Sequence, residues 1–164
     1  MLRSVLKILH ENFPSIKRVT FRDVSAFDCN GANVWLSYHS LLVNGMTWYE
    51  KHFGAKPLEQ HIKECVYSFK NLLVQKPKRG VFSFAKGFDK FETWNDYFRS
   101  IDDCNYFLEH MNEIERVSAV KLVYSEWYIP VRKIAGYSVD ILSVKKIKKK
   151  YGGGALGLVV SGGI

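Results

Sequence analysis

The stretch TWYEKHFGAKPLEQHIKECVYSFKNLL, residues 47–73, carries the clearest helix signals in this chain of 164 residues. Thr47 and Glu50 have the spacing of a capping box, in which the hydroxyl accepts from the amide three residues later and the carboxylate reaches back to the cap. Gly54 stands where a helix terminus in the left-handed conformation favours glycine. Residues 48–53 are therefore predicted to form a short helix.

A longer helix is predicted to begin at Pro57, because proline suits the first helical turn, where its missing amide proton leaves nothing unsatisfied. Its apolar side chains recur at helical spacing and form one stripe: Leu58, Ile62, Cys65, Val66, Phe69, Leu72 and Leu73. The apolar pattern from Phe91 to Ile114 keeps the same period and predicts one continuous helix of more than twenty residues. Residues 2–13 predict a first helix, which Pro14 ends.

Strand patterns flank these helices, with β-branched and aromatic residues bounded by turn residues. Residues 16–38 are predicted to form a β-hairpin, in which the segment 16–27, with Val19, Phe21 and Val24, pairs with Val34–Tyr38 around a turn at 28–33. The alternation in residues 81–85 predicts a short strand behind a basic loop. Two further strands are predicted over 117–131 and 137–144.

This element order predicts a single α+β domain over residues 1–144, in which an antiparallel sheet packs against two or three helices. The composition is 47% hydrophobic and 15% aromatic, which supplies a sizeable core. Residues 145–164 differ, because they hold six of the twelve glycines and a run of lysines. Such a segment loses much entropy on ordering, so we expect a basic, Gly-rich tail that orders on binding a partner.

The formal net charge of +8 indicates polyanionic partners. Residues 89–116 carry eight acidic and three basic residues, so the rest of the chain has a net charge of +13. Phosphate binding needs several cations that act together. The tail lysines and the loop KPKRG are therefore predicted to contact nucleic acid or another anionic surface. The predicted residues are Lys145, Lys146, Lys148, Lys149, Lys150, Lys76, Lys78 and Arg79. The alternative is a solvated charge run.

The three cysteines, Cys29, Cys65 and Cys104, are an odd number at wide spacing, so we expect neither a disulfide framework nor a metal knuckle. That expectation favours an intracellular, reducing compartment. No apolar run approaches the ~18 residues that a membrane-spanning helix requires. The N-terminal residues 1–13 include charges and lack a cleavage site, so no signal peptide is expected.

No catalytic, metal or cofactor motif emerges. His61 and Cys65 lie four residues apart, but no second ligand pair matches them, so a structural thiol beside a boundary histidine is the better interpretation. The paired acids Asp102 and Asp103, or Glu109 and Glu113, favour an outer acidic face over a hydrolase site.

The string RGVFSFAKGF is similar to the basic, aromatic strand of RNA-recognition modules, whose aromatics stack on bases. Val81 stands where the first aromatic should be, and the element order differs from that of the module. Phe82 and Phe84 are therefore predicted to be core residues.

The aromatic segment around residues 47–55 has two interpretations. It forms either a structural corner anchored by Trp48 and Phe53, or a ligand pocket that uses Trp48, Tyr49, Glu50 and His52. The string TWYEKHFGA resembles a motif in small, mostly uncharacterised proteins of nucleocytoplasmic large DNA viruses. The lysine run followed by GGGA also resembles the basic tails and processing sites of structural precursors in such viruses.

Together these features predict a non-enzymatic structural or packaging protein, and the resemblance to viral proteins implies that it is a component of a virion. It would bind other proteins, or copies of itself, and nucleic acid. The alternative is a small acyltransferase-like enzyme with a pocket near Tyr49, Glu50 and His52. No Q/R-x-x-G-x-G/A loop for a pyrophosphate accompanies that pocket, and no cofactor is expected.

Overall fold

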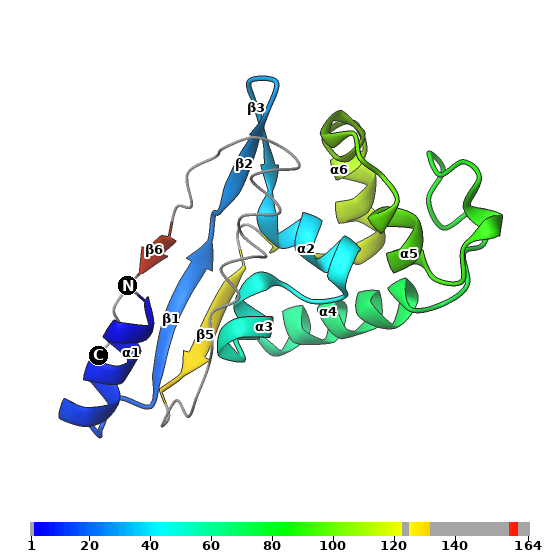
Figure 1. Ribbon diagram of the computed structural model, residues 1–164. Helices are drawn as coiled ribbons and strands as arrows, with labels where there is room; N and C mark the ends of the chain where they lie inside the picture. The colour runs from blue at the N-terminus through cyan, green and yellow to red at the C-terminus, as the bar shows by residue number, and fades with distance from the viewer. Residues whose placement is uncertain (1, 123–124, 132–157, 161–164) are drawn as a thin grey trace.

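The computed structural model describes residues 2–122, 125–131 and 158–160, which form an α+β domain (Figure 1). Its helices are α1 (Leu2–Asn12), α2 (Leu36–Asn44), α3 (Trp48–Phe53), α4 (Gln60–Leu73), the 3₁₀ turn η1 (Phe88–Lys90), α5 (Trp94–Arg99) and α6 (Cys104–Ser118). Its strands are β1 (Arg18–Asp23), β2 (Ala26–Cys29), β3 (Ala32–Trp35), β4 (Lys56–Pro57), β5 (Glu126–Pro130) and β6 (Leu158–Val160). The predicted fold class is confirmed.

The main sheet is antiparallel, with strand order β4-β5-β1-β6. Phe21 of β1 lies opposite Trp127 of β5, and both side chains are buried. In Figure 1 the sheet stands on one side and α2 to α6 lie on the other. Strand β6 comes from the stretch that the sequence assigns to the tail, and it pairs with β1 through Leu158–Val160. That part of the tail therefore belongs to the sheet.

The hairpin forms around the predicted turn, but its first strand is shorter than predicted. Strands β2 and β3 pair around Asn30 and Gly31, whose φ values of 53° and 86° fit a two-residue hairpin turn. The prediction is confirmed for Ala26 and Phe27, which pair with Trp35 and Val34. It is wrong for residues 18–23, which form β1 and pair with β5 and β6 instead. The turn at 28–33 is confirmed, but β1 belongs to a sheet completed by distant residues.

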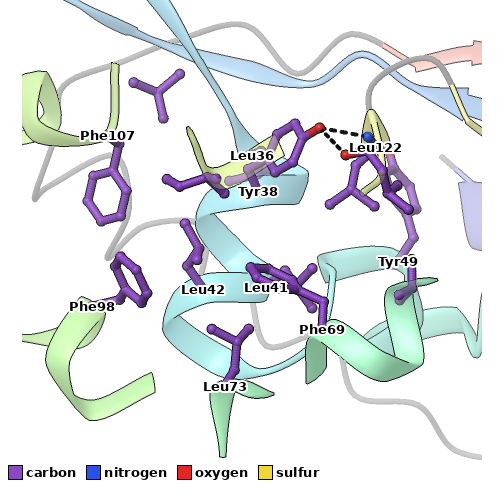
Figure 2. Close-up of a cluster of buried hydrophobic side chains, with 14 of the residues drawn as sticks. Leu36, Tyr38, Leu41, Leu42, Tyr49, Phe69, Leu73, Phe98, Phe107 and Leu122 are labelled. Atoms are coloured by element: carbon purple, nitrogen blue, oxygen red, sulfur yellow. Dashed lines mark hydrogen bonds between the residues drawn. The ribbon is translucent and has the colours of Figure 1, made fainter. Parts of the chain in front are cut away.

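Helix α2 was expected to be part of a strand. Seven of its nine residues are buried, so its sequence carries no polar face to reveal the helical period. Figure 2 shows why it is central, since apolar side chains from several elements surround it. The Tyr38 hydroxyl donates to the carbonyl of Val120 at 2.8 Å and accepts from the amide of Leu122 at 2.9 Å. Burial raises the pKa of Tyr38 well above its usual value, so it stays a neutral donor.

The capping box of α3 is confirmed. The Thr47 hydroxyl accepts from the amide of Glu50, and the Glu50 carboxylate accepts from the amide of Thr47 at 2.8 Å. Gly54 ends the helix with a φ of 63°. Helix α4 buries Val66, Phe69 and Leu73 of its predicted stripe, but it begins at Gln60, because Pro57 is in β4 instead.

The predicted continuous helix from Phe91 to Ile114 is wrong, because it is broken into α5 and α6. Thr93 caps α5 by accepting from the amide of Asp96, and Asp103 caps α6 by accepting from the amide of Asn105. An N-cap residue has extended backbone angles, so a new cap starts a new helix whatever the apolar period continues to indicate.

Two strand predictions also need correction. Residues 81–85 form turns, and the backbone of Ala85 donates to Phe82 rather than to a neighbouring strand. Within the described residues 117–122 and 125–131, β5 is the only strand, and α6 extends to Ser118. The strand expected over 137–144 lies outside the described residues.

A disulfide joins Cys29 at the end of β2 to Cys104 at the start of α6, across 75 residues of sequence. The expectation of no disulfide is therefore wrong, since spacing in sequence says nothing about cysteines that the fold brings together. Cys65 is the free cysteine among the described residues. The bond gives no support to the predicted reducing compartment.

Asp23 is a buried carboxyl, and its pKa is raised because burial disfavours the charge, although the amide and hydroxyl of Ser25 donate to it. Above its unfolded-state pKa, the unfolded chain releases this proton while the folded chain retains it, so the contribution of Asp23 to stability falls as pH rises. We expect Asp23→Asn to gain stability relative to the wild type between pH 4 and 7, by about 1.4 kcal/mol for each unit of the raised pKa.

Urea unfolding at several pH values checks this expectation. The exposed-carboxylate variant Glu92→Gln serves as the control, and its difference from the wild type should change little over the same range. A difference between Asp23→Asn and the wild type that stays constant from pH 4 to 7 would show that this carboxyl has an ordinary pKa.

Candidate polyanion-binding loop

Residues 74–87 connect α4 to η1 without a helix or strand, which makes an unusually long irregular connection for a compact domain. The loop is nevertheless anchored in the core. Phe82 is 2% exposed, and its ring centroid lies 5.0 Å from that of Trp94 and 5.3 Å from that of Phe98. In Figure 1 the loop, drawn in green, lies far from the sheet.

Hydrogen bonds hold the loop at several further points. The backbone amide of Ser83 donates to the Glu113 carboxylate at 2.8 Å, and the Ser83 hydroxyl donates to the same carboxylate. These bonds, with help from Arg116, lower the pKa of Glu113. The amide of Lys86 donates to the Tyr97 hydroxyl at 3.3 Å. An ordered backbone therefore presents the polar side chains of the loop.

Five cations of the loop region point into solvent: Lys76, Lys78, Arg79, Lys86 and Lys90. Within the described part of the chain, none of the five forms an ion pair within 4.0 Å of a carboxylate. Lys90 lies 5.4 Å from the centroid of the Phe91 ring. Asp89 is the acidic residue of this stretch, so the loop region carries a net charge of +4.

The loop encloses a half-open hollow of about 580 Å³. Its lining includes the polar residues Arg79, Ser83, Lys86 and Asp89 and the aromatic residues Phe82 and Phe88. Its size falls in the range of small-molecule sites, and its lining is a mixture of polar and apolar groups.

Gly80 and Gly87 also line this hollow, and both have positive φ, at 82° and 62°. A Cβ atom at either position would meet nothing within 4 Å, so backbone conformation rather than crowding requires glycine. The two glycines therefore let the loop turn without filling the hollow.

Phe82 and Phe84 do not form the exposed pair that an RNA-recognition strand needs. Phe82 is buried, as predicted, and Phe84 is half-buried and stacked on His110 at 4.0 Å between ring centroids. Tyr106 packs edge-on to both rings. The prediction that these two residues belong to the core is confirmed for Phe82, and Phe84 packs against the core while partly buried.

The residues of the alternative ligand pocket on α3 make contacts that stabilise the fold. Tyr49 and His52 are buried, and the Tyr49 ring packs 4.7 Å from that of Phe21. Burial raises the pKa of Tyr49 to about 12, so this phenol is a poor acid or base at neutral pH. Glu50 completes the capping box and pairs with Lys70. These contacts favour the structural corner.

Trp48 and Phe53 anchor that corner less deeply than expected, because both are half-buried. Trp48 lies against His52, with 4.7 Å between their ring centroids. The buried anchors of the corner are therefore the second and fifth residues of α3, Tyr49 and His52. The acyltransferase hypothesis stays a prediction that no contact described here favours.

The other predicted residues lie apart from the loop. His61 is exposed beside Glu59, and Cys65 is half-buried on α4. No group of three or more metal-ligating side chains occurs among the residues that the structure describes. Asp102 and Asp103 are exposed, and Asp103 caps α6. Lys145 to Lys150 lie outside the described residues.

The sequence pointed to Lys76, Lys78 and Arg79 but missed Lys86, Lys90 and the hollow between the two basic ends of the loop. The signal was present in the string KPKRGVFSFAKGF, in which glycines separate basic residues from a buried aromatic core.

No helix in the described ranges is long and apolar enough to cross a membrane.

Comparison with known protein families, with curated proteins and with solved structures finds no match to this chain.

Proposed function

We propose that the protein binds nucleic acid. The contacts are made by the basic loop of residues 76–90 and by the lysines of residues 145–150. The observation that carries the proposal is the set of five exposed loop cations held on an ordered backbone. Free cations on a fixed scaffold gain the most from releasing the counterions of a phosphate chain, because they lose little entropy on binding.

The remaining features support a structural or packaging role rather than catalysis. The candidate pocket around α3 is occupied by capping and core contacts. Residues 89–116 carry the acidic excess, which gives the molecule a second surface that favours a basic partner, including the loop of another copy. A place in a viral particle is a further part of this proposal, and it rests on the resemblance of residues 47–55 to viral proteins.

A pair of charge variants tests the loop. Lys76→Gln, Lys78→Gln and Arg79→Gln together remove three charges from the loop, while Lys51→Gln, Lys56→Gln and Lys63→Gln remove three exposed charges from elsewhere. We expect the loop variant to bind a labelled duplex about tenfold more weakly or worse at constant salt, and the control variant to stay within about twofold of the wild type. Fluorescence anisotropy measures both affinities.

Equal weakening by the two variants would mean that net charge attracts the duplex without a defined site, and would overturn the proposal for the loop. The tail lysines are tested separately by replacing Lys145 to Lys150 with glutamine. Substitution is preferable to deletion, because deleting the tail also removes β6 from the sheet.

A further inference from the structure

The lining of the hollow includes two residues that phosphate binding does not require, the acidic Asp89 and the aromatic Phe88. Arg79 and Lys86 attract phosphate, but the carboxylate of Asp89, which lies in η1, would repel it. A site that serves the phosphate chain alone gains nothing from an exposed carboxylate. The groups that a carboxylate recognises are hydrogen-bond donors, which nucleic acids carry on their bases and, in RNA, on the ribose.

Phe88 adds a second group that suits a nucleotide, an aromatic ring on which a base can stack. Phe88 is a half-buried residue of the lining, and its ring centroid lies 5.6 Å from that of Trp94, so contact with the core holds the ring in place. A fixed aromatic ring is a stacking surface for a base, and the gain is sequence-tolerant because every base has a π-face. In a duplex the bases are already stacked and paired, so only a single strand offers a free base.

From these groups we infer that the hollow holds one nucleotide of a single strand, with the base against Phe88, a base or sugar donor on Asp89 and the phosphate near Arg79 and Lys86. The protein then binds single-stranded nucleic acid more tightly than a duplex of the same sequence. This inference rests on the proposed function and names the form of nucleic acid that the same loop selects.

The test compares one labelled oligonucleotide of mixed sequence as a single strand and as a duplex. The wild type should prefer the single strand by about tenfold. Phe88→Leu should lower single-strand affinity by about fivefold or more and leave duplex affinity within about twofold. Phe53→Leu is the matched control, because Phe53 is also a half-buried aromatic residue but lies on α3 and does not line the hollow, and it should change neither affinity.

Asp89→Asn separates recognition from electrostatics. Removing a negative charge strengthens any purely electrostatic contact, and the nearby exposed control Glu92→Gln should raise or preserve both affinities equally. The nucleotide site predicts instead that Asp89→Asn weakens single-strand binding relative to duplex binding. Nucleoside monophosphates should compete for the single strand, whereas inorganic phosphate at the same ionic strength should not.

The outcomes distinguish the two proposals. If the triple loop variant weakens binding while Phe88→Leu and Asp89→Asn leave the ratio of single-strand to duplex affinity unchanged, the nucleotide site is wrong and the basic loop stands. If the triple loop variant binds both forms as the wild type does, the proposed function itself fails.

Discussion

Removing the disulfide by replacing Cys29 and Cys104 with alanine should lower the free energy of unfolding by about 4 kcal/mol. The bond closes a loop of 75 residues, and in the chain-entropy account a cross-link destabilises the unfolded chain more as the loop it closes becomes longer. It also ties the β2–β3 hairpin to the first residue of α6, two elements that are distant in sequence. Urea unfolding of the oxidised wild type and the double variant measures the difference.

Cys65→Ala is the matched control, because Cys65 is the free cysteine of the described residues and its loss removes no cross-link. Reducing the wild type should reproduce the instability of the double variant, and reduction should not affect the double variant itself. A double variant as stable as the wild type, together with three reactive thiols in the air-oxidised protein, would show that the bond does not form in solution.

Phe82→Ala should destabilise the protein by about 3 to 5 kcal/mol, the usual cost of deleting a buried phenylalanine ring. Phe82 is 2% exposed and contacts the rings of Phe69, Trp94 and Phe98. It is also the deepest anchor of the basic loop, so the same change should weaken duplex binding under conditions where the protein remains folded. Thermal unfolding followed by circular dichroism gives the first effect, and anisotropy gives the second.

Phe27→Ala is the control for this variant, because Phe27 is equally buried but lies on β2, outside the loop. It should cost a similar amount of stability and leave the affinity unchanged. Phe82→Leu keeps an apolar anchor and guards against a variant that fails to fold; it should bind within about twofold of the wild type. Full affinity in a folded Phe82→Ala variant would contradict the view that loop order matters for binding.

The sequence predicted those parts of the fold that local interactions decide. The capping box at Thr47, the turn at Asn30 and Gly31 and the apolar stripe of α4 depend on residues only a few positions apart, and all three are present. Helix α2 was missed because burial on all sides erases the amphipathic pattern. The break before α6 was missed because a cap at Asp103 interrupts the helix without interrupting the apolar period.

The sequence could not show which distant segments would pair, because local patterns carry no information about contacts between residues far apart in the chain. Nothing local to β1 says that β5 and β6 will flank it, and nothing in the spacing of Cys29 and Cys104 places them together. The basic residues Lys76, Lys78 and Arg79 of the candidate site could be predicted, because runs of charge are visible in a sequence.

The hollow could not be predicted, because it forms only where Phe82 enters the core and the chain turns at Gly80 and Gly87 on either side.

The salt dependence of duplex binding tests the polyanion-binding loop most directly. For each variant, the logarithm of the binding constant is plotted against the logarithm of the salt concentration, and the slope counts the phosphate contacts. The variant Lys76→Gln, Lys78→Gln and Arg79→Gln should have a slope about 2 to 3 smaller in magnitude than the wild type, at ~0.9 per lost contact. The control with Lys51, Lys56 and Lys63 replaced should differ from the wild type by less than about 1. Identical slopes for the loop variant and the wild type would contradict the assignment of the loop to phosphate.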